Sequence, residues 1–261
     1  MGNKEKKAER LKELLTDDRH KHANYQLLPS ELDLFLKTNE LISKPHFEEE
    51  RLAYFFKHLC PANKLVLDIG GNTGYFSFEF LKRGATCVDC YEGGKAHAEF
   101  LSLASDLIGL NDRFNVHKKY FTFKDENIRN YDIILLLNVL HHVGDDYGNA
   151  SVTRQKAKLQ IIKHLNYLAQ KTNFLIFQLG FNWKGDTKQC LFEHGTKSEM
   201  IQFIKDGIKG FWEIIEIGVA EKKDGVVTYE PLNVFNVKRN DTLGEFLNRP
   251  IFILKSCLQR G

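Results

Sequence analysis

The chain has 261 residues, and 43% of them are hydrophobic, which suits one large globular domain with appendages and excludes a disordered or fibrous protein. Its 37 basic and 34 acidic residues leave a formal net charge of +3, which is too small to indicate a nucleic-acid partner. No apolar run approaches the roughly 18 residues of a membrane span, and residues 1–22 lack the apolar centre of a signal peptide. We therefore expect a cytoplasmic protein that makes no contact with a membrane.

The five cysteines are scattered along the chain, and their odd number argues against a disulfide framework. Cys87 and Cys90 form a C-x-x-C motif, but both lie in an expected strand, where positions three apart face opposite sides of the sheet. Two thiolates placed in this way do not converge easily on one ion. Glu193 and His194 are adjacent but have no third ligand at helical spacing. We therefore expect no metal site.

Residues 1–60 are expected to form a helical N-terminal extension, followed by a second domain of residues 61–261. Basic and acidic side chains are interleaved in residues 1–22, which is typical of a solvated helix face. Ser30 and Asp33 form a helix-capping motif, and Pro45 opens another helix. No strand is expected in this part of the chain.

From residue 64 onward, apolar segments with the length of strands alternate with helical patterns, which is typical of a parallel sheet covered on both faces. The expected strands are residues 64–69, 86–91, 114–117, 131–137, 173–179, 213–219 and 250–256. The predicted fold class is therefore α/β, with a doubly wound, mostly parallel seven-stranded sheet. Substrate loops are expected around residues 180–212 and 221–249, because long connections are often functional.

The first expected strand ends at Asp68 and runs into a glycine-rich turn that contains Gly70, Gly71, Asn72 and Gly74. In open α/β sheets ligands bind at the carboxyl ends of the strands, so this turn is a candidate cofactor site. Its glycine spacing fits neither the G-x-G-x-x-G motif of dinucleotide sites nor a phosphate-binding P-loop. An acidic strand end repels phosphate but attracts a cation, which favours a sulfonium ligand over a nucleotide.

Glu92 ends the second expected strand, 18 residues after Gly74. A carboxylate at about this distance can accept hydrogen bonds from both hydroxyls of a ribose. The expected ligand therefore carries ribose as well as positive charge.

Three segments, VLDIGGNTGYFS, CVDCYE and YDIILLLNVLHHVG, resemble in order and spacing the motifs of class I S-adenosylmethionine-dependent methyltransferases. The resemblance covers residues 64–180 and implies a Rossmann-like fold that binds S-adenosyl-L-methionine. It implies that Asp68 and the glycines of the turn wrap the methionine part of the cofactor, and that Glu92 holds the ribose. Asn72 replaces the family's usual middle glycine and adds a side chain that can contact the cofactor.

An acidic residue after the third strand often holds the adenine amine in this family, and this chain has no counterpart. The chain offers Tyr120 and Phe121 instead, and we expect the adenine to stack on one of these rings. Asn138, at the end of the fourth expected strand, completes the predicted cofactor site.

His141 and His142 follow the fourth expected strand, whose carboxyl end should lie beside the methyl group that is transferred. Methyl transfer is an in-line displacement from sulfur, and a base is needed only if the acceptor arrives protonated. One of the two histidines is a candidate base, and orienting or packing roles are the alternative. Six further residues are candidate contacts for the acceptor: Tyr25, His46, Asn182, Trp183, Glu193 and His194.

The sequence thus predicts an S-adenosylmethionine-dependent methyltransferase that acts on an oxygen or nitrogen atom of a small polar metabolite. By analogy with bacterial enzymes, the acceptor is expected to be a sugar or a phosphorylated intermediate of surface-glycan biosynthesis. A second interpretation is a tRNA or other RNA methyltransferase, in which Tyr25, Trp183 and Trp212 handle an exposed base. A third is a noncatalytic scaffold that binds the cofactor. Nothing in the sequence specifies an oligomeric state.

Overall fold

The computed structural model describes residues 2–16, 26–36, 46–125 and 127–258. Its α/β architecture divides into two compact units. Unit 1 contains Met1–Leu52 and Pro61–Phe121, and unit 2 contains Ala53–Cys60 and Thr122–Gly261. These units differ from the two domains expected from the sequence, whose boundary at residue 60 stays a prediction.

Unit 1 contains three parallel strands in the order β3-β2-β1. The strands are β1 (Leu65–Ile69), β2 (Cys87–Tyr91) and β3 (Phe114–His117). Its helices are α1 (Asn3–Thr16), the 3-10 turn η1 (Ser30–Leu32), α2 (Asp33–Leu36), α4 (Tyr75–Lys82) and α5 (Lys95–Ile108). Strands β1 and β2 are nearly continuous runs of buried side chains, as expected where helices cover a parallel sheet.

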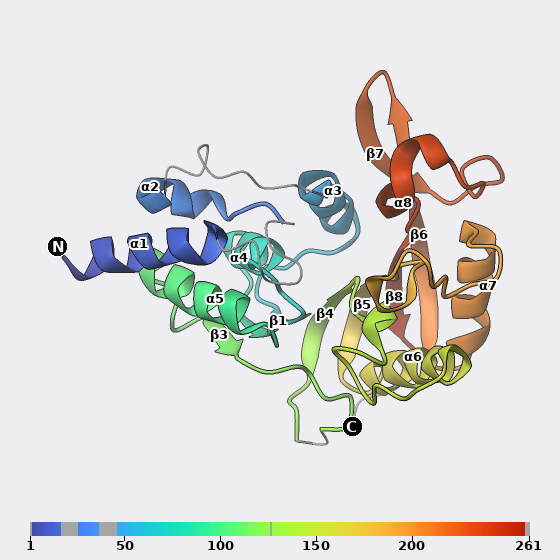
Figure 1. Ribbon diagram of the computed structural model, residues 1–261, viewed down its shortest axis with the longest axis horizontal. Coiled ribbons are helices and arrows are strands. Elements are labelled where there is room, and N and C mark those ends of the chain that lie inside the picture. Colours follow the sequence, from blue (N-terminus) through green and yellow to red (C-terminus); the bar gives the residue numbers. More distant parts are fainter. Residues whose placement is uncertain (1, 17–25, 37–45, 126, 259–261) are drawn as a thin grey trace. The chain divides into compact units, whose positions relative to one another are not determined.

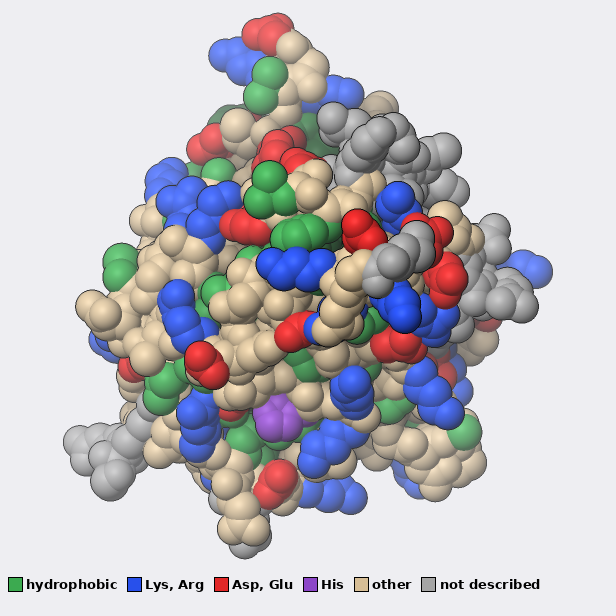
Figure 2. All heavy atoms as spheres, turned by 90° about the vertical axis from the view of Figure 1, so that its left-hand side faces the viewer, with side chains coloured by type: hydrophobic (Ala, Val, Ile, Leu, Met, Phe, Trp, Pro, Cys, Tyr) green, Lys and Arg blue, Asp and Glu red, His purple; other side chains and the backbone are tan. Residues whose placement is uncertain are grey.

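Helix α1 lies along α5 (Figure 1). It buries Leu11, while Lys7 pairs with Asp106 and Arg10 pairs with Glu99 across the two helices. Basic and acidic side chains are interspersed on the face of the molecule drawn in Figure 2. The described part of the N-terminal charge pattern therefore forms a helix with one buried leucine and a charged surface.

Unit 2 contains five strands in the order β4-β5-β8-β6-β7. The strands are β4 (Tyr131–Leu137), β5 (Thr172–Gln178), β6 (Trp212–Lys223), β7 (Val226–Pro231) and β8 (Ile251–Ser256). The pair β4–β5 is parallel, whereas β5–β8, β6–β8 and β6–β7 are antiparallel. The helical elements are η3 (Leu140–His142), α6 (Arg154–Leu168), η4 (Trp183–Gly185), α7 (Lys197–Gly207), η5 (Asp241–Leu243) and α8 (Gly244–Leu247).

The α/β class is confirmed, but the expected count of seven strands is wrong because β7 is an eighth strand. β7 lies inside residues 221–249, which we expected to be a substrate loop, and it forms a hairpin with β6. Lys223 pairs with Val226, so the hairpin turn consists of Asp224 and Gly225, at φ values of 52° and 85°. An Asp-Gly pair with two positive φ angles is a preferred two-residue hairpin turn.

Helix α3 spans Glu48–His58, and the division between the units falls within it. The described parts of residues 1–60 are helices and turns, and a separate helical extension stays a prediction. No helix in the described ranges has the length and apolar composition needed to cross a membrane.

Candidate active site

The glycine turn after β1 is built from residues in the left-handed region of backbone space. Gly70, Asn72 and Gly74 have φ values of 78°, 53° and 84°. Asparagine tolerates this region better than most residues, which explains how it replaces glycine at position 72. Asn72 uses its side-chain oxygen to accept a hydrogen bond from the Thr73 N–H, at 2.9 Å. The cofactor contact expected for this side chain stays a prediction.

Two of the glycines are required by packing inside the unit. A Cβ added to Gly71 would lie 2.2 Å from Cys90 Sγ, and one added to Gly74 would lie 2.5 Å from Leu101 Cδ2. Both distances are too short for real contacts, so a larger residue would displace the turn. The glycine pattern thus reflects how closely the turn approaches β2 and α5.

Glu92 is buried and connects the glycine turn to the start of α5. Its Oε2 accepts a hydrogen bond from the Asn72 N–H at 2.8 Å, and its Oε1 accepts one from the Gly94 N–H at 2.7 Å. A carboxylate offers about four lone-pair sites, so these two bonds are compatible with an additional ribose contact. The structure adds a positioning role, because Glu92 holds the turn in place.

Asp68 lies at the end of β1 and is 4% exposed. Burial raises the pKa of Asp68 to about 7, the hydrogen bond donated by Ser77 at 2.7 Å opposes this rise, and the charge of Glu92 adds to it. A cationic ligand nearby would favour the ionised carboxylate. The electrostatics of the turn are therefore suited to a positively charged group.

Gln26 closes over the turn from a distant part of the sequence. Its Oε1 accepts hydrogen bonds from the Thr73 hydroxyl at 3.1 Å and from the Tyr75 N–H at 3.3 Å. Gln26 thereby occupies the N-terminus of α4, the position at which a dinucleotide site holds its pyrophosphate. Gln26 could not be predicted from the sequence, because nothing in the local pattern links it to a turn 47 residues away.

Tyr120 and Phe121, the two residues whose rings are candidates to stack on adenine, have different environments. The ring of Tyr120 covers the backbone of Gly93, where an added Cβ would lie 2.3 Å from it, and Tyr120 is 41% exposed. Phe121 is buried and contacts Tyr91 edge-on, with ring centroids 5.0 Å apart. Because stacking requires an accessible ring face, Tyr120 is the better candidate.

In unit 2, Asn138 belongs to a buried polar network at the carboxyl ends of β4 and β5. Its Nδ2 donates to Gln178 Oε1 at 3.0 Å, and its Oδ1 accepts from Arg249 Nη1 at 2.8 Å. Arg249 also pairs with Glu245. These bonds fix the orientation of the Asn138 amide, and its predicted cofactor contact stays a prediction. No sequence motif marks its partners Gln178 and Arg249, nor Glu245.

His141 and His142 are both buried, and their contacts give them different chemistry. The Gly180 N–H donates to Nδ1 of His141 at 3.4 Å, so a neutral His141 carries its proton on Nε2. Nδ1 of His142 lies 3.3 Å from a carboxylate oxygen of Asp145 and 3.6 Å from one of Asp146. These carboxylates favour the tautomer with its proton on Nδ1, which places the basic lone pair of His142 on Nε2. His142 therefore has the arrangement of a carboxylate-oriented base.

His142, Asp145 and Asp146 also offer three ligand atoms within 4.8 Å of one another. Such spacing can surround a divalent cation, although the hydrogen-bonding role explains the same geometry. The expectation that the protein has no metal site stays a prediction.

The other predicted acceptor contacts are held in local interactions. The backbone N–H of His46 donates to the Glu48 carboxylate, and those of Glu193 and His194 donate to the Glu199 carboxylate. Asn182 lies at the start of η4, and Nε1 of Trp183 donates to the Val143 carbonyl at 2.7 Å. Trp183 thus connects the segment after β5 to the end of η3. Tyr25 lies outside the described residues.

No protein-family model and no curated protein sequence matches the chain. Among solved structures, WbdD aligns with 94% of this chain and 46% of its own, at 14% identity and a TM-score of 0.58. A second structure, named as the bifunctional kinase-methyltransferase WbdD, aligns over the same shares at 16% identity and a TM-score of 0.54. The chain thus spans about half the length of the WbdD structures that it matches.

A protein from Streptococcus thermophilus, named "putative hemolysin", aligns with 84% of this chain and 68% of its own, at 12% identity and a TM-score of 0.52. At these identities the likeness concerns the arrangement of helices and strands. Together with the glycine turn after β1 and the acidic end of β2, it agrees with the fold implied by the sequence motifs. The chain shares its overall α/β fold with the WbdD structures.

Proposed function

We propose that the protein is an S-adenosylmethionine-dependent methyltransferase that acts in the cytoplasm on an oxygen or nitrogen atom of a small polar metabolite. The acceptor that we propose is a sugar or a phosphorylated intermediate of bacterial surface-glycan biosynthesis. The observation that carries the methyltransferase assignment is the pair of buried carboxylates, Asp68 and Glu92, on either side of the glycine turn.

The residues of unit 1 fit a cationic nucleoside better than a dinucleotide. Gln26 already occupies the N-terminus of α4, and two nearby carboxylates would repel a pyrophosphate. Burial is the main cause of the raised pKa of Asp68 and the charge of Glu92 adds to it, so a cation bound nearby would offset the cost of ionising this carboxylate. Asp68 would hold the methionine part of the cofactor, Glu92 the ribose, and the exposed ring of Tyr120 the adenine.

Bound S-adenosylmethionine supplies an electrophilic methyl group on a positively charged sulfur. The residues of the chain bind this group, align the acceptor and remove its proton where necessary. His142 is the proposed base, because Asp145 and Asp146 favour the tautomer with a lone pair on Nε2. His141 is proposed to orient the segment after β5 through Gly180.

A screen with methyl-labelled cofactor tests this proposal. The acceptors are sugar nucleotides, sugar phosphates and bulk tRNA, each assayed with the whole chain. Label in the sugar fractions supports the proposal, whereas label only in tRNA selects the RNA methyltransferase. A protein that binds the cofactor but transfers no label to any fraction fits the noncatalytic scaffold.

A further inference from the structure

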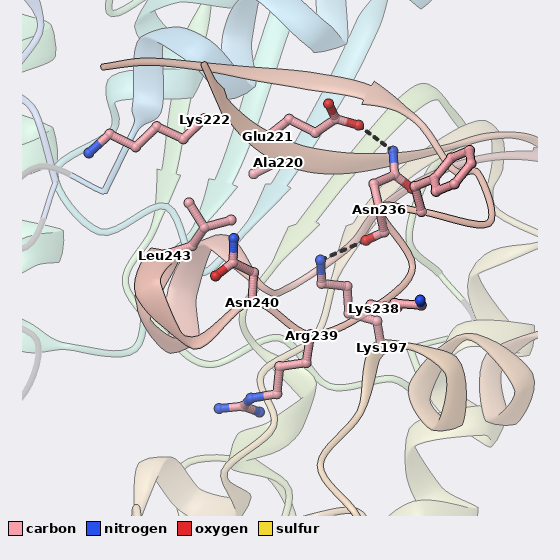
Figure 3. A pocket seen from close by; sticks show the side chains of 10 residues that line it. Lys197, Ala220, Glu221, Lys222, Asn236, Lys238, Arg239, Asn240 and Leu243 are labelled. Carbon is pink, nitrogen blue, oxygen red and sulfur yellow. Dashed lines mark hydrogen bonds between the residues drawn. The ribbon is translucent and has the colours of Figure 1, made fainter. Parts of the chain in front are cut away.

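Unit 2 contains a second candidate site, a pocket of about 400 Å³ beside the β6–β7 hairpin (Figure 3). Its walls come from the end of β6, the first residue of α7, the segment between β7 and η5, and the last residue of η5. Four cationic side chains line it: Lys197, Lys222, Lys238 and Arg239. Glu221 is the one acidic residue among the lining residues, so the pocket carries an excess of positive charge. We refer to it as the basic pocket.

Lys197 is the buried cation of the basic pocket and is 1% exposed. Its Nζ donates to the Asn236 carbonyl at 2.8 Å, and the Asn236 side chain donates to Glu221 at 2.7 Å (Figure 3). In the part of the chain that the structure describes, no ion pair includes Lys197. Burial lowers the pKa of Lys197, and Glu221 opposes this effect. A buried ammonium without a paired anion is unfavourable, so an anionic ligand would stabilise it.

Arg239 is held rigidly at the edge of the basic pocket. Its Nε donates to Asp241 at 2.6 Å, its Nη1 donates to the Gly195 carbonyl at 2.7 Å, and its guanidinium lies 5.3 Å from the centre of the Phe181 ring. These contacts hold its planar fork in one orientation. A fixed guanidinium is suited to bind the oxygens of a phosphate or carboxylate.

The same contacts connect the basic pocket to the predicted acceptor side of unit 2. Phe181, which lies under Arg239, donates its backbone N–H to Glu245, and Glu245 pairs with Arg249. Arg249 donates to Asn138. Gly180, which precedes Phe181 in the chain, donates its backbone N–H to His141. One continuous set of contacts therefore extends from the basic pocket to the ends of β4 and β5.

We propose that the basic pocket binds a phosphate group carried by the methyl acceptor. A phosphate monoester carries nearly two negative charges near pH 7 and three acceptor oxygens, which match Lys197 and the surrounding cations. The bounded pocket and its acidic wall residue fit a small phosphorylated molecule better than the extended basic surface that a nucleic acid requires. This inference rests on the proposed methyltransferase function, since it assigns the phosphate to the acceptor.

The first test measures binding of inorganic phosphate to the whole chain by calorimetry, without cofactor. We expect Lys197→Gln to weaken binding by about tenfold or more, the effect of losing a hydrogen bond to a charged group. Lys222 lines the pocket and Lys223 does not, although they are neighbours in one strand. Lys223→Gln is therefore the matched control, and it should leave the affinity within about twofold. If Lys197→Gln fails to fold, the double variant Lys222→Gln/Lys238→Gln replaces it, with the same expectation of weaker binding.

The second test compares methyl transfer to hexose phosphates with transfer to the same hexoses without phosphate. The phosphorylated acceptors should have the higher kcat/KM, and the pocket variants should raise KM for them while kcat stays unchanged. Equal kcat/KM for both classes would overturn the acceptor role. If Lys197→Gln or the double variant leaves the phosphate affinity unchanged, the basic pocket is not a phosphate site. The same conclusion follows if Lys223→Gln weakens binding equally, which would mean that the ion is adventitious only. tRNA binding that falls equally in Lys222→Gln and Lys223→Gln would indicate an extended nucleic-acid surface and would also overturn it.

Failure of the proposed function gives a different result. In that case no acceptor is methylated, whether or not the cofactor binds, while phosphate binding still responds to Lys197→Gln. If the protein transfers methyl groups but Lys197→Gln does not change its phosphate affinity, the proposed function stands and only phosphate binding in the basic pocket is contradicted.

Discussion

The Glu92 carboxylate accepts hydrogen bonds from the backbone of Asn72 and Gly94, so its removal would disturb the turn as well as the proposed ribose contact. We expect Glu92→Ala to weaken S-adenosylmethionine binding by about 1 to 3 kcal/mol, the cost of losing a hydrogen bond to a charged group. The free energy of unfolding should also fall, because two N–H groups lose their acceptor. Calorimetry and thermal denaturation measure the two effects, and Glu92→Gln is the control that keeps one acceptor oxygen. An unchanged dissociation constant in the folded alanine variant would place the ribose contact elsewhere.

The raised pKa of Asp68 predicts that the affinity for the cofactor depends on pH. Burial raises the pKa of Asp68 to about 7, and a bound cation favours the ionised form. Affinity for S-adenosylmethionine should therefore rise by roughly tenfold between about pH 6 and pH 8 as Asp68 ionises. In Asp68→Asn the affinity should depend on pH only through the titration of the cofactor itself. Identical pH profiles for the two proteins would contradict a contact between Asp68 and the positive charge.

The same raised pKa has the opposite effect on the stability of the empty protein. An aspartate in the unfolded chain has a pKa of about 4, so between about pH 4 and pH 7 the folded state binds more protons than the unfolded state. The contribution of Asp68 to the free energy of unfolding thus falls as pH rises through this window. Asp68→Asn should remove this part of the pH dependence.

His142 and His141 should respond differently to substitution. We expect His142→Ala to lower turnover by about 10²- to 10⁴-fold, the usual contribution of a general base, while cofactor affinity stays unchanged. His141→Ala removes the acceptor of the Gly180 N–H and should lower thermal stability more than turnover. If His142→Ala keeps full turnover with the true acceptor, His142 is not the base, and the protein accelerates the reaction by aligning the acceptor with the methyl group alone.

The turn of the β6–β7 hairpin allows a measurement of how backbone strain at one residue changes the free energy of unfolding. Gly225 has a φ of 85°, and a Cβ added there would meet no atom within 4 Å. Gly225→Ala should therefore lower the free energy of unfolding by about 1 kcal/mol, entirely through backbone strain. Gly225→Asn is the matched control, because asparagine tolerates positive φ and should cost less. Chemical denaturation measures both variants, and equal stability of Gly225→Ala and the native protein would exclude strain at this turn.

Elements with strong local signals could be predicted from the sequence. The expected strands at residues 64–69 and 131–137 agree with β1 and β4, because buried parallel strands are apolar throughout. The eighth strand was missed because the adjacent Val226 and Val227 hide in the sequence the alternation of buried and exposed residues that the structure shows, although its Asp-Gly turn was a usable signal. In the candidate site, Asp68 and Glu92 follow from their places at strand ends. Gln26 and Arg249 could not be predicted, since their partners lie 49 and 111 residues away.

At the scale of the whole molecule, cofactor binding should appear as increased thermal stability. A ligand that binds only the folded state at 100 times its dissociation constant adds about 2.7 kcal/mol to the free energy of unfolding. We expect S-adenosylmethionine and its demethylated product to raise Tm, and NAD to leave it unchanged. A rise with NAD and none with either sulfur nucleoside would contradict the methyltransferase assignment.

The close approach of Gly71 to the Cys90 sulfur affects how the protein can be labelled. Burial raises the pKa of the Cys90 thiol well above its ordinary value, so it stays protonated and unreactive beneath the turn. Cys60, Cys190 and Cys257 are exposed. Thiol-reactive fluorophores or spin labels should therefore attach to these three positions first, all of them in unit 2, without disturbing the glycine turn. Native cysteines thus offer spectroscopic reporters for measuring how ligands change the molecule in solution.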